Sequence, residues 1–126
     1  MLFRSLSPEA APELKVNGAL TIGENIGDLG GLTIAYKAYE ISLGSAKPPV
    51  IDGFSGYQRF FLGWAQCWRS KYRPEEARRR IATDPHSPAE FRCNQIVANL
   101  DEFHAAFALT KDDHHFMPEN ARVRIW

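Results

Sequence analysis

Apolar side chains recur at helical spacing in five segments of this chain, and stretches rich in proline and glycine separate several of them. The longest segment runs from about Ile22 to Leu43 and ends at a glycine- and proline-rich loop, residues 44–53. Spacings of four and three place its apolar residues on one stripe of a helix. That stripe comprises Ile22, Ile26, Leu29, Thr33 and Tyr36.

A second helix is predicted to begin near Ser55, which has capping-box spacing with Gln58. Large rings dominate this segment, so we expect it to form much of the core. Its rings are Tyr57, Phe60, Phe61, Trp64 and Trp68. A third, charged helix should begin at Pro74 and end near Thr83, because proline suits the first turn of a helix.

Residues 84–88, with the sequence DPHSP, should form a rigid connector because each proline restricts the residue before it. Ser87, Pro88 and Glu90 are spaced as a cap, a first-position proline and a capping-box glutamate. This spacing predicts a fourth helix that runs to about Ala98.

A short fifth helix is predicted over residues 101–108, followed by a polar tail from Thr110. The sequence contains no internal repeat. The pattern therefore predicts a mainly α fold, a single helical domain of about five helices over residues 21–126. Residues 1–20, which lack a sustained period, are predicted to form an extended lead-in.

Composition narrows the classes of function. The 126 residues carry 15 basic and 15 acidic side chains, so no net positive field favours nucleic acid. One basic cluster, Arg73 with residues 78–80, is diluted by Glu75 and Glu76 and is interpreted as a solvated helix face. No apolar run reaches the roughly 20 residues that a membrane span needs, and residues 1–4 open no signal peptide.

Two cysteines, Cys67 and Cys93, are too few for a disulfide framework. A single bridge between them is one reading. Both lie in segments predicted to be helical, which favours two separate buried thiols.

Glycines within the first predicted helix call for an explanation. Gly27, Gly30 and Gly31 each cost about 1 kcal/mol relative to alanine in a helix interior. Close approach of another element is the usual reason for such positions. One helix face near them begins with two carboxylates and continues with small residues. That face comprises Glu24, Asp28, Gly31 and Ala35.

Taken alone, the two carboxylates have ordinary explanations. Glu24 has the spacing of a capping box with Thr21. Asp28 can be a solvated carboxylate near the positive end of the helix. A Glu-x-x-x-Asp spacing by itself is therefore a weak signal.

Three ordered segments resemble one family. Residues 23–31, GENIGDLGG, closely resemble the GENIADxGG signature of the neprilysin family of zinc metallopeptidases, which includes endothelin-converting enzyme and PepO-type enzymes. Residues 60–68, FFLGWAQCW, followed by YRPE at 72–75, are similar to its aromatic helix. Residues 84–92, DPHSPAEFR, resemble its DxHSPxxFR segment, and the terminal Trp126 also fits. The similarity covers roughly residues 13–126.

The resemblance implies a zinc site of which this chain holds part. Glu24 would be the third zinc ligand, completing a site with two histidines and an open position. Asp28, one turn further, would accept a hydrogen bond from a zinc-binding histidine and fix its ring. The small face behind these carboxylates would then receive the helix that carries the histidines.

Roles for the other segments follow from the same resemblance. His86 would stabilise the oxyanion that forms at the peptide carbonyl, with Asp84 orienting its ring. Arg92 would bind a substrate carbonyl through its planar donor fork. Cys67 and Trp68 match positions that line the pocket for the residue after the scissile bond. The family usually has an aliphatic residue where this chain has Cys67, so the size of the pocket stays open.

Each of these residues also has a reading outside the family. His86 beside a proline can be an exposed loop histidine. Arg92 in the first turn of a helix can pair with Glu90 or Asp84. Trp68 can be an ordinary core residue. His104, His114 and His115 gain no role from the resemblance.

The HExxH motif of the family is absent from this sequence. We therefore interpret the chain as the C-terminal part of a zincin-type catalytic domain, inactive alone and without tight zinc binding. Peptides would be substrates of the intact enzyme, and the usual setting of the family is extracytoplasmic. The alternative is a stand-alone, non-catalytic helical interaction module that binds a partner, with self-association through the Gly27/Gly31 face.

Overall fold

The computed structural model describes residues 6–125, so predictions for residues 1–4 and for Trp126 fall outside the described residues. Within residues 6–125, helices account for all the regular secondary structure, apart from one isolated bridge between Ile51 and Phe54. The elements in chain order are α1 (Gly18–Leu43), α2 (Gly56–Cys67), α3 (Pro74–Thr83), α4 (Ala89–Val97), α5 (Asp101–Phe107) and the 3-10 helix η1 (Glu119–Ala121). The predicted mainly α fold with five α-helices is confirmed.

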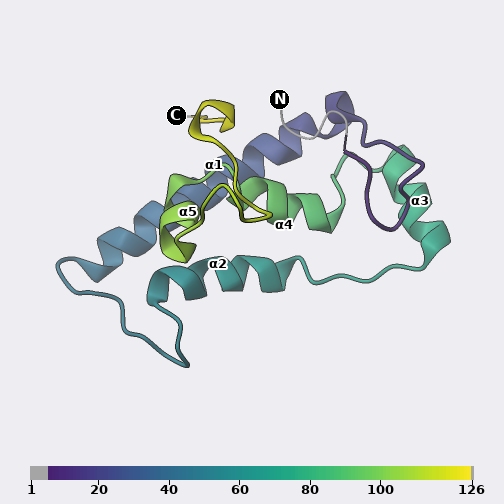
Figure 1. The fold of residues 1–126 in the computed structure, drawn as a ribbon. Coiled ribbons are helices and arrows are strands. Elements are labelled where there is room, and N and C mark those ends of the chain that lie inside the picture. Colours follow the sequence, from purple (N-terminus) through teal and green to yellow (C-terminus); the bar gives the residue numbers. More distant parts are fainter. Residues whose placement is uncertain (1–5, 126) are drawn as a thin grey trace.

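Figure 1 shows how these helices are arranged. The long α1 runs along one side of the molecule, and α4 packs against both α1 and α2, while α2 also packs against α5. The α3 helix stands at one end, beyond the ends of α2 and α4. The core lies where α1, α2, α4 and α5 meet. It is formed by Val16, Leu29, Leu32, Tyr36, Phe61, Phe91, Ile96, Val97 and Leu100.

The first helix begins one turn earlier than predicted, because the Asn17 side chain accepts hydrogen bonds from the backbone N–H groups of Ala19 and Leu20. Thr21 therefore lies inside the helix, where its hydroxyl donates to the Asn17 carbonyl oxygen. A capping box between Thr21 and Glu24 is thus excluded as the explanation of Glu24.

The buried stripe of α1 also differs from the prediction. Leu29 and Tyr36 are buried as expected, whereas Ile22 and Ile26 are exposed. The packed face is shifted round the helix toward polar residues, so apolar spacing alone misplaced it. The buried residues of α1 are Gly18, Thr21, Asn25, Leu29, Gly30, Leu32 and Tyr36.

Capping was predicted correctly for α2 and incorrectly for α4. Ser55 and Gln58 form the predicted reciprocal capping box at the start of α2. At α4, Pro88 stands at the N-cap and no side chain caps the helix. Glu90 instead accepts a hydrogen bond from the Glu9 backbone N–H, and the buried Ser87 hydroxyl has no hydrogen-bond partner in the described structure.

The aromatic prediction for α2 holds in part, because Phe61 is buried in the core, whereas Tyr57, Phe60 and Trp64 are partly buried against it. Phe61 stacks on Tyr36 of α1, with ring centroids 5.5 Å apart, and meets Phe103 of α5 edge-on at 5.3 Å. Such pairs add roughly 0.5–1.5 kcal/mol each beyond the area that they bury. These contacts fix α2 between α1 and α5.

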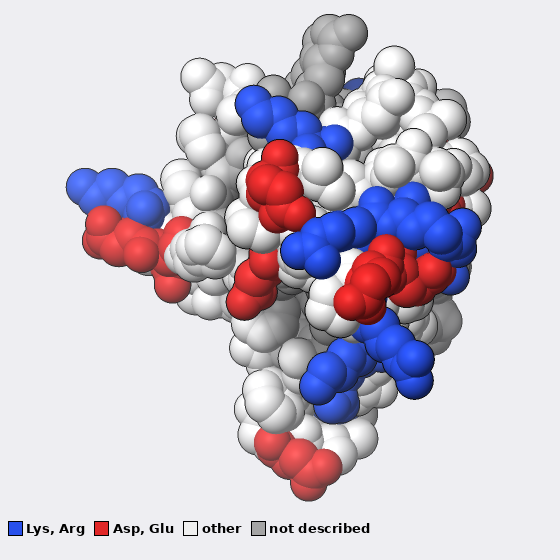
Figure 2. Space-filling model, turned by 90° about the vertical axis from the view of Figure 1, so that its right-hand side faces the viewer, with Lys and Arg blue, Asp and Glu red and all other residues white. Residues whose placement is uncertain are grey.

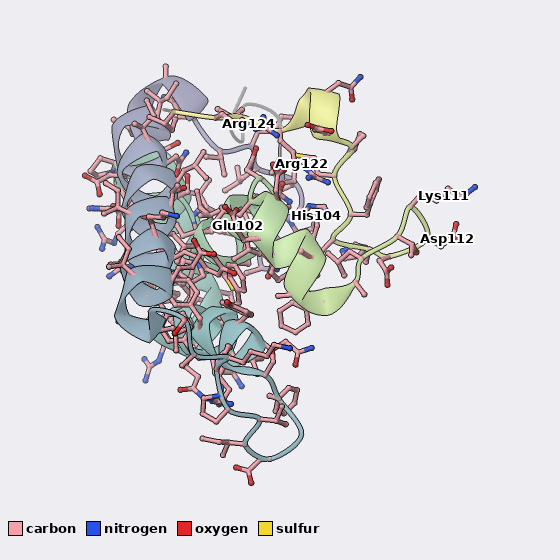
Figure 3. The ribbon with its side chains drawn as sticks, turned by 90° about the vertical axis from the view of Figure 1, so that its left-hand side faces the viewer. Glu102, His104, Lys111, Asp112, Arg122 and Arg124 are labelled. Carbon is pink, nitrogen blue, oxygen red and sulfur yellow. The ribbon has the colours of Figure 1, made fainter. Side chains whose placement is uncertain are left out.

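The C-terminal tail crosses α5 and is tied to it by polar contacts (Figure 3). Arg122 donates to Asp101 at 2.5 Å and lies 3.1 Å from Nδ1 of the buried His104. Arg124 also donates to Asp101, and the Val123 backbone N–H donates to Asn99. No helix among the described residues is long and apolar enough to cross a membrane.

Candidate active site

The packing of α4 on α1 brings together five of the seven residues that the sequence singled out, and a sixth, Trp68, contacts one of these five. Glu24 and Asp28 lie one turn apart on α1, and Arg92 lies in the first turns of α4. Asp84 and His86 belong to the connector between α3 and α4. The site is therefore formed by two helices and a proline-bounded loop.

Arg92 and Asp28 form the most buried ion pair of the site. The Nε of Arg92 donates to Oδ2 of Asp28 at 2.5 Å, and its Nη2 donates to Oδ1 at 2.7 Å. The two side chains are only 14% and 10% exposed. Hydrogen bonding to Asp28 raises the pKa of Arg92 above its ordinary value. This two-pronged geometry makes the pair a fixed unit.

The pair overturns two of the ordinary readings. Asp28 is not a solvated carboxylate, because its side chain is almost fully covered. Arg92 does not pair with Glu90, which instead accepts from the Glu9 backbone, and its hydrogen bonds go to Asp28 rather than to Asp84.

Asp84 holds His86 in one orientation. Its Oδ1 accepts from the His86 backbone N–H at 2.9 Å and lies 2.7 Å from the ring Nδ1. A carboxylate only accepts hydrogen bonds, so Nδ1 is protonated, and Nε2 is a donor only when the ring carries a second proton. Partial burial by itself raises the pKa of Asp84, but the hydrogen bonds from His86 and the charges of His86 and Arg80 lower it overall. His86 is half-exposed yet paired, which distinguishes it from a free loop histidine.

Glu24 is the point at which these groups converge. Its Oε2 lies 3.3 Å from Nε2 of His86 and 3.6 Å from Nη2 of Arg92. The Glu24 side chain is 47% exposed, so one of its sides faces solvent. A carboxylate oxygen is one of the donor types that zinc takes in proteins.

Beside Glu24, the helix carries an open strip. A Cβ added at Gly23, Gly27 or Gly31 would meet no atom within 4 Å. The close neighbour that was predicted for Gly27 and Gly31 is therefore not among residues 6–125, whereas Gly30 is buried within them. Among these residues, no group of three or more metal-binding side chains is assembled either. Glu24 is thus a half-exposed carboxylate with an uncovered helix surface beside it.

Trp68 contacts Arg92 of the site, whereas the Cys67 thiol bonds within its own helix. The Arg92 guanidinium lies over the Trp68 ring, 4.3 Å from its centroid, which is the geometry of a cation–π contact. Cys67 is exposed, and its Sγ contacts the Gly63 carbonyl oxygen of its own helix at 3.4 Å. Cys67 and Cys93 are both free thiols, as favoured, but neither is fully buried, since Cys67 is exposed and Cys93 is half-buried.

Sequence reasoning missed the residues that support Asp84. Arg80 donates to Oδ2 of Asp84 at 3.2 Å, and Glu76 accepts from Arg80 at 2.8 Å. The signal was visible, because Glu76 and Arg80 on α3 and Asp84 just after it follow one another at spacings of four. Their assignment to a solvated face hid it. Figure 2, which views this end of the molecule, shows basic and acidic side chains interleaved.

Comparisons with known proteins agree with this geometry. A model of peptidase family M13 matches residues 2–123. Neprilysin of Homo sapiens is 40% identical over 127 residues, covering 98% of this chain and 17% of its own length. Endothelin-converting enzyme 1 of Cavia porcellus is 43% identical over 95 residues, covering 73% of this chain and 13% of its own length.

Solved structures extend the likeness to the fold. Mycobacterium tuberculosis zinc metalloprotease ZMP1, in complex with an inhibitor, matches with a TM-score of 0.94 and 53% identity. The match covers 99% of this chain and 20% of that chain. The same metalloprotease in its open state gives a TM-score of 0.91. The chain spans a fifth or less of the length of these relatives.

The helical fold and its neighbours define the class as that of metalloprotease domains. The chain belongs to peptidase family M13. The resemblance to the neprilysin family that the three sequence segments indicated is thereby confirmed.

Proposed function

We propose that this chain supplies one wall of the catalytic site of a zinc-dependent metalloendopeptidase. One observation carries the proposal: Oε2 of Glu24 lies within 3.6 Å of both the His86 ring and the Arg92 guanidinium. The residues that would serve as metal ligand, oxyanion donor and substrate-binding cation are thus drawn from three parts of the chain. Family membership supports assigning them to peptide hydrolysis.

Glu24 would be the ligand that this chain contributes to zinc. Bound zinc would supply Lewis acidity and would lower the pKa of a water molecule. The open strip at Gly23, Gly27 and Gly31 would receive the helix that carries the remaining ligands. Asp28 lies one turn from Glu24 and would face that helix. The carboxylate lone pairs of Asp28 that do not accept from Arg92 would be available to accept a hydrogen bond from that helix.

His86 in its imidazolium form, with a proton on each ring nitrogen, would donate a hydrogen bond from Nε2 to the oxygen that becomes negative as water adds to the peptide carbonyl. Asp84 holds Nδ1, so the ring presents Nε2 toward Glu24, where the reacting carbonyl would lie. A donor held in place before the reaction needs no reorganisation as charge develops, which is the source of its effect.

Arg92 would bind a substrate carbonyl with the donors that Asp28 does not use. The pair with Asp28 occupies Nε and one hydrogen of Nη2. A guanidinium has five N–H donors, so the Nη1 edge is left for a ligand. Trp68, beneath the guanidinium, would form one wall of the adjoining side-chain pocket. Cys67, whose Sγ bonds within its own helix, contributes to that pocket only if its side chain changes rotamer.

A chimera tests the proposal. The matching fifth of ZMP1 would be replaced by this chain, and peptide hydrolysis would be measured with and without zinc. We expect zinc-dependent turnover, which Glu24→Gln abolishes and His86→Gln lowers by about 10²–10³-fold in kcat, as for loss of an oxyanion donor. Lys37→Gln, which breaks an exposed ion pair, serves as the control.

Two outcomes would contradict the proposal. One is full activity of the folded Glu24→Gln chimera. The other is a folded chimera that binds zinc but hydrolyses no peptide.

The chain by itself is proposed to be inactive and to bind zinc weakly, because one carboxylate is not a complete site. A peptidase assay with added zinc should show no turnover, and metal analysis should find no stoichiometric zinc. Turnover that Glu24→Ala removes would contradict the first point.

A further inference from the structure

Asp84 is held through both of its carboxylate oxygens. His86 occupies Oδ1 with its backbone N–H and its ring Nδ1, at 2.9 and 2.7 Å. Nη1 of Arg80 donates to the other oxygen, Oδ2, at 3.2 Å. A carboxylate that is bonded on one oxygen alone can turn about its side-chain torsions. Arg80 therefore removes a freedom that His86 cannot remove.

Arg80 is itself fixed by its neighbours. Its Nε donates to Oε1 of Glu76 at 2.8 Å, and its guanidinium carbon lies 4.6 Å from the centroid of the Tyr72 ring. Glu76 is strongly acidic, because hydrogen bonds from Arg79 and Arg80 lower its pKa to about 2. The Glu76 carboxylate is therefore charged at neutral pH, where it holds the Arg80 guanidinium.

Arg79 provides an internal comparison. It lies next to Arg80 on α3 and donates twice to the same Glu76, at 2.8 Å each. Both of these side-chain hydrogen bonds of Arg79 go to Glu76, whereas Arg80 bonds to Asp84 as well as to Glu76. Both arginines contribute charge near the end of α3, where a cation is favourable. They differ in whether they reach the residue that orients His86.

We propose that Arg80 is a positioning residue for His86, acting through Asp84. A chain of contacts thus runs from Glu76 through Arg80 and Asp84 to the His86 ring, whose Nε2 faces Glu24. The contacts stand on their own. Their catalytic consequence rests on the proposed function of His86.

Side-chain rotamers of Asp84 and His86, measured by three-bond NMR couplings in the isotope-labelled 126-residue chain, test the proposal. We expect one χ1 rotamer for each residue in the unaltered chain and in Arg79→Met. In Arg80→Met, the couplings of both residues should become averaged over several rotamers. Arg80→Lys, which keeps the charge near the end of α3 but not the planar fork, should restore them in part.

The outcomes separate positioning from simple stabilisation of α3. Unaveraged couplings in Arg80→Met would overturn the proposal. Equal averaging in Arg79→Met and Arg80→Met would also overturn it, since the stability of α3 would then be what holds the connector. If Arg80→Met unfolds α3, Arg80→Lys becomes the deciding variant. Couplings equal to those of the unaltered chain would then show that the planar guanidinium is not needed to position His86.

The ZMP1 chimera separates this proposal from the proposed function. Arg80→Met should lower kcat by on the order of tenfold, the scale for residues that orient a reacting group, with KM little changed. A chimera that depends on His86 but not on Arg80 would overturn the positioning role and leave the function standing. Full activity of a folded chimera that carries His86→Gln would overturn the proposed function.

Discussion

At the scale of single residues, the Arg92–Asp28 pair joins α4 to α1 across 64 positions of sequence. Both side chains are largely removed from solvent. Attraction between two such charges is offset by the cost of desolvating them, so the pair need not add much net stability. Removing one partner is different, because it leaves the other charge buried and unpaired.

Replacing Arg92 should therefore be costly. We expect Arg92→Met to lower the free energy of unfolding by about 3 kcal/mol or more, the range for breaking a buried ion pair. Urea denaturation followed by circular dichroism measures it. Lys37→Met is the control, because it breaks an exposed pair with Glu40 and should cost no more than about 0.5 kcal/mol. Equal costs in the two variants would contradict the burial argument.

The sequence predicted which residues form the site better than it predicted their partners. Glu24, Asp84 and His86 were identified by local motifs, and the structure brings them together. The pairing of Arg92 with Asp28 depends on how α4 packs on α1, which no local spacing encodes. The bond from Arg80 to Asp84 was encoded by a spacing of four, but similar spacings occur on many solvated helices.

At the scale of elements, two serines at helix starts make a matched test. Ser55 caps α2, so Ser55→Ala should lower the free energy of unfolding by about 1 kcal/mol. Ser87 is buried before α4 without a hydrogen-bond partner, so Ser87→Ala should be neutral or slightly stabilising. Urea unfolding of the two variants measures the contrast. A larger loss for Ser87→Ala would show that its hydroxyl has a partner.

Helix ends were predictable where one side chain decides them. Ser55 and Gln58 fulfil a local geometric rule, and Pro74 does begin α3. At α4, the Glu90 side chain was drawn away by the Glu9 backbone, a contact between segments 81 positions apart. The predicted apolar stripe of α1 was wrong because the apolar residues of this helix are spread over more than one of its faces.

At the scale of the whole molecule, α1 leaves an apolar surface exposed beside its open glycines. The exposed large apolar side chains on this helix are Leu20, Ile22, Ile26, Ile34 and Ile41. Exposed apolar surface can mark a contact site. We propose that this face, which includes Gly27 and Gly31, lets the chain self-associate at high concentration.

Sedimentation velocity over a range of concentrations tests this proposal. We expect the sedimentation coefficient to rise with concentration, and Ile34→Glu to suppress that rise by placing a charge on the face. Val50→Glu, at an equally exposed apolar position in the loop between α1 and α2, should leave the rise unchanged. A chain that stays monomeric at every concentration would contradict the proposal.

Acid should loosen the C-terminal tail. A hydrogen bond from Arg122, with the charge of Arg124, lowers the pKa of Asp101 below its ordinary value of 3.8. The unfolded chain therefore binds a proton at a higher pH than the folded chain does. The contribution of Asp101 is thus fully present above about pH 5 and is lost as the pH falls through and below about 4.

The free energy of unfolding, measured by urea denaturation at pH 7, 5 and 3, should fall between pH 5 and 3. Asp101→Asn should be less stable at pH 7 and should show a shallower fall, because the titrating group is gone. Parallel pH profiles for the two proteins would contradict this assignment.

The strip at Gly23, Gly27 and Gly31 has a consequence for complementation in trans. The groups beside it are already held: Asp28 by Arg92, and His86 by Asp84. A receptor that is ordered before its ligand arrives loses little conformational entropy on binding. A separate polypeptide carrying an HExxH helix could then dock on this wall as on a rigid template. The chain would then serve as one part of a split peptidase, whose activity would report that the two polypeptides have bound each other.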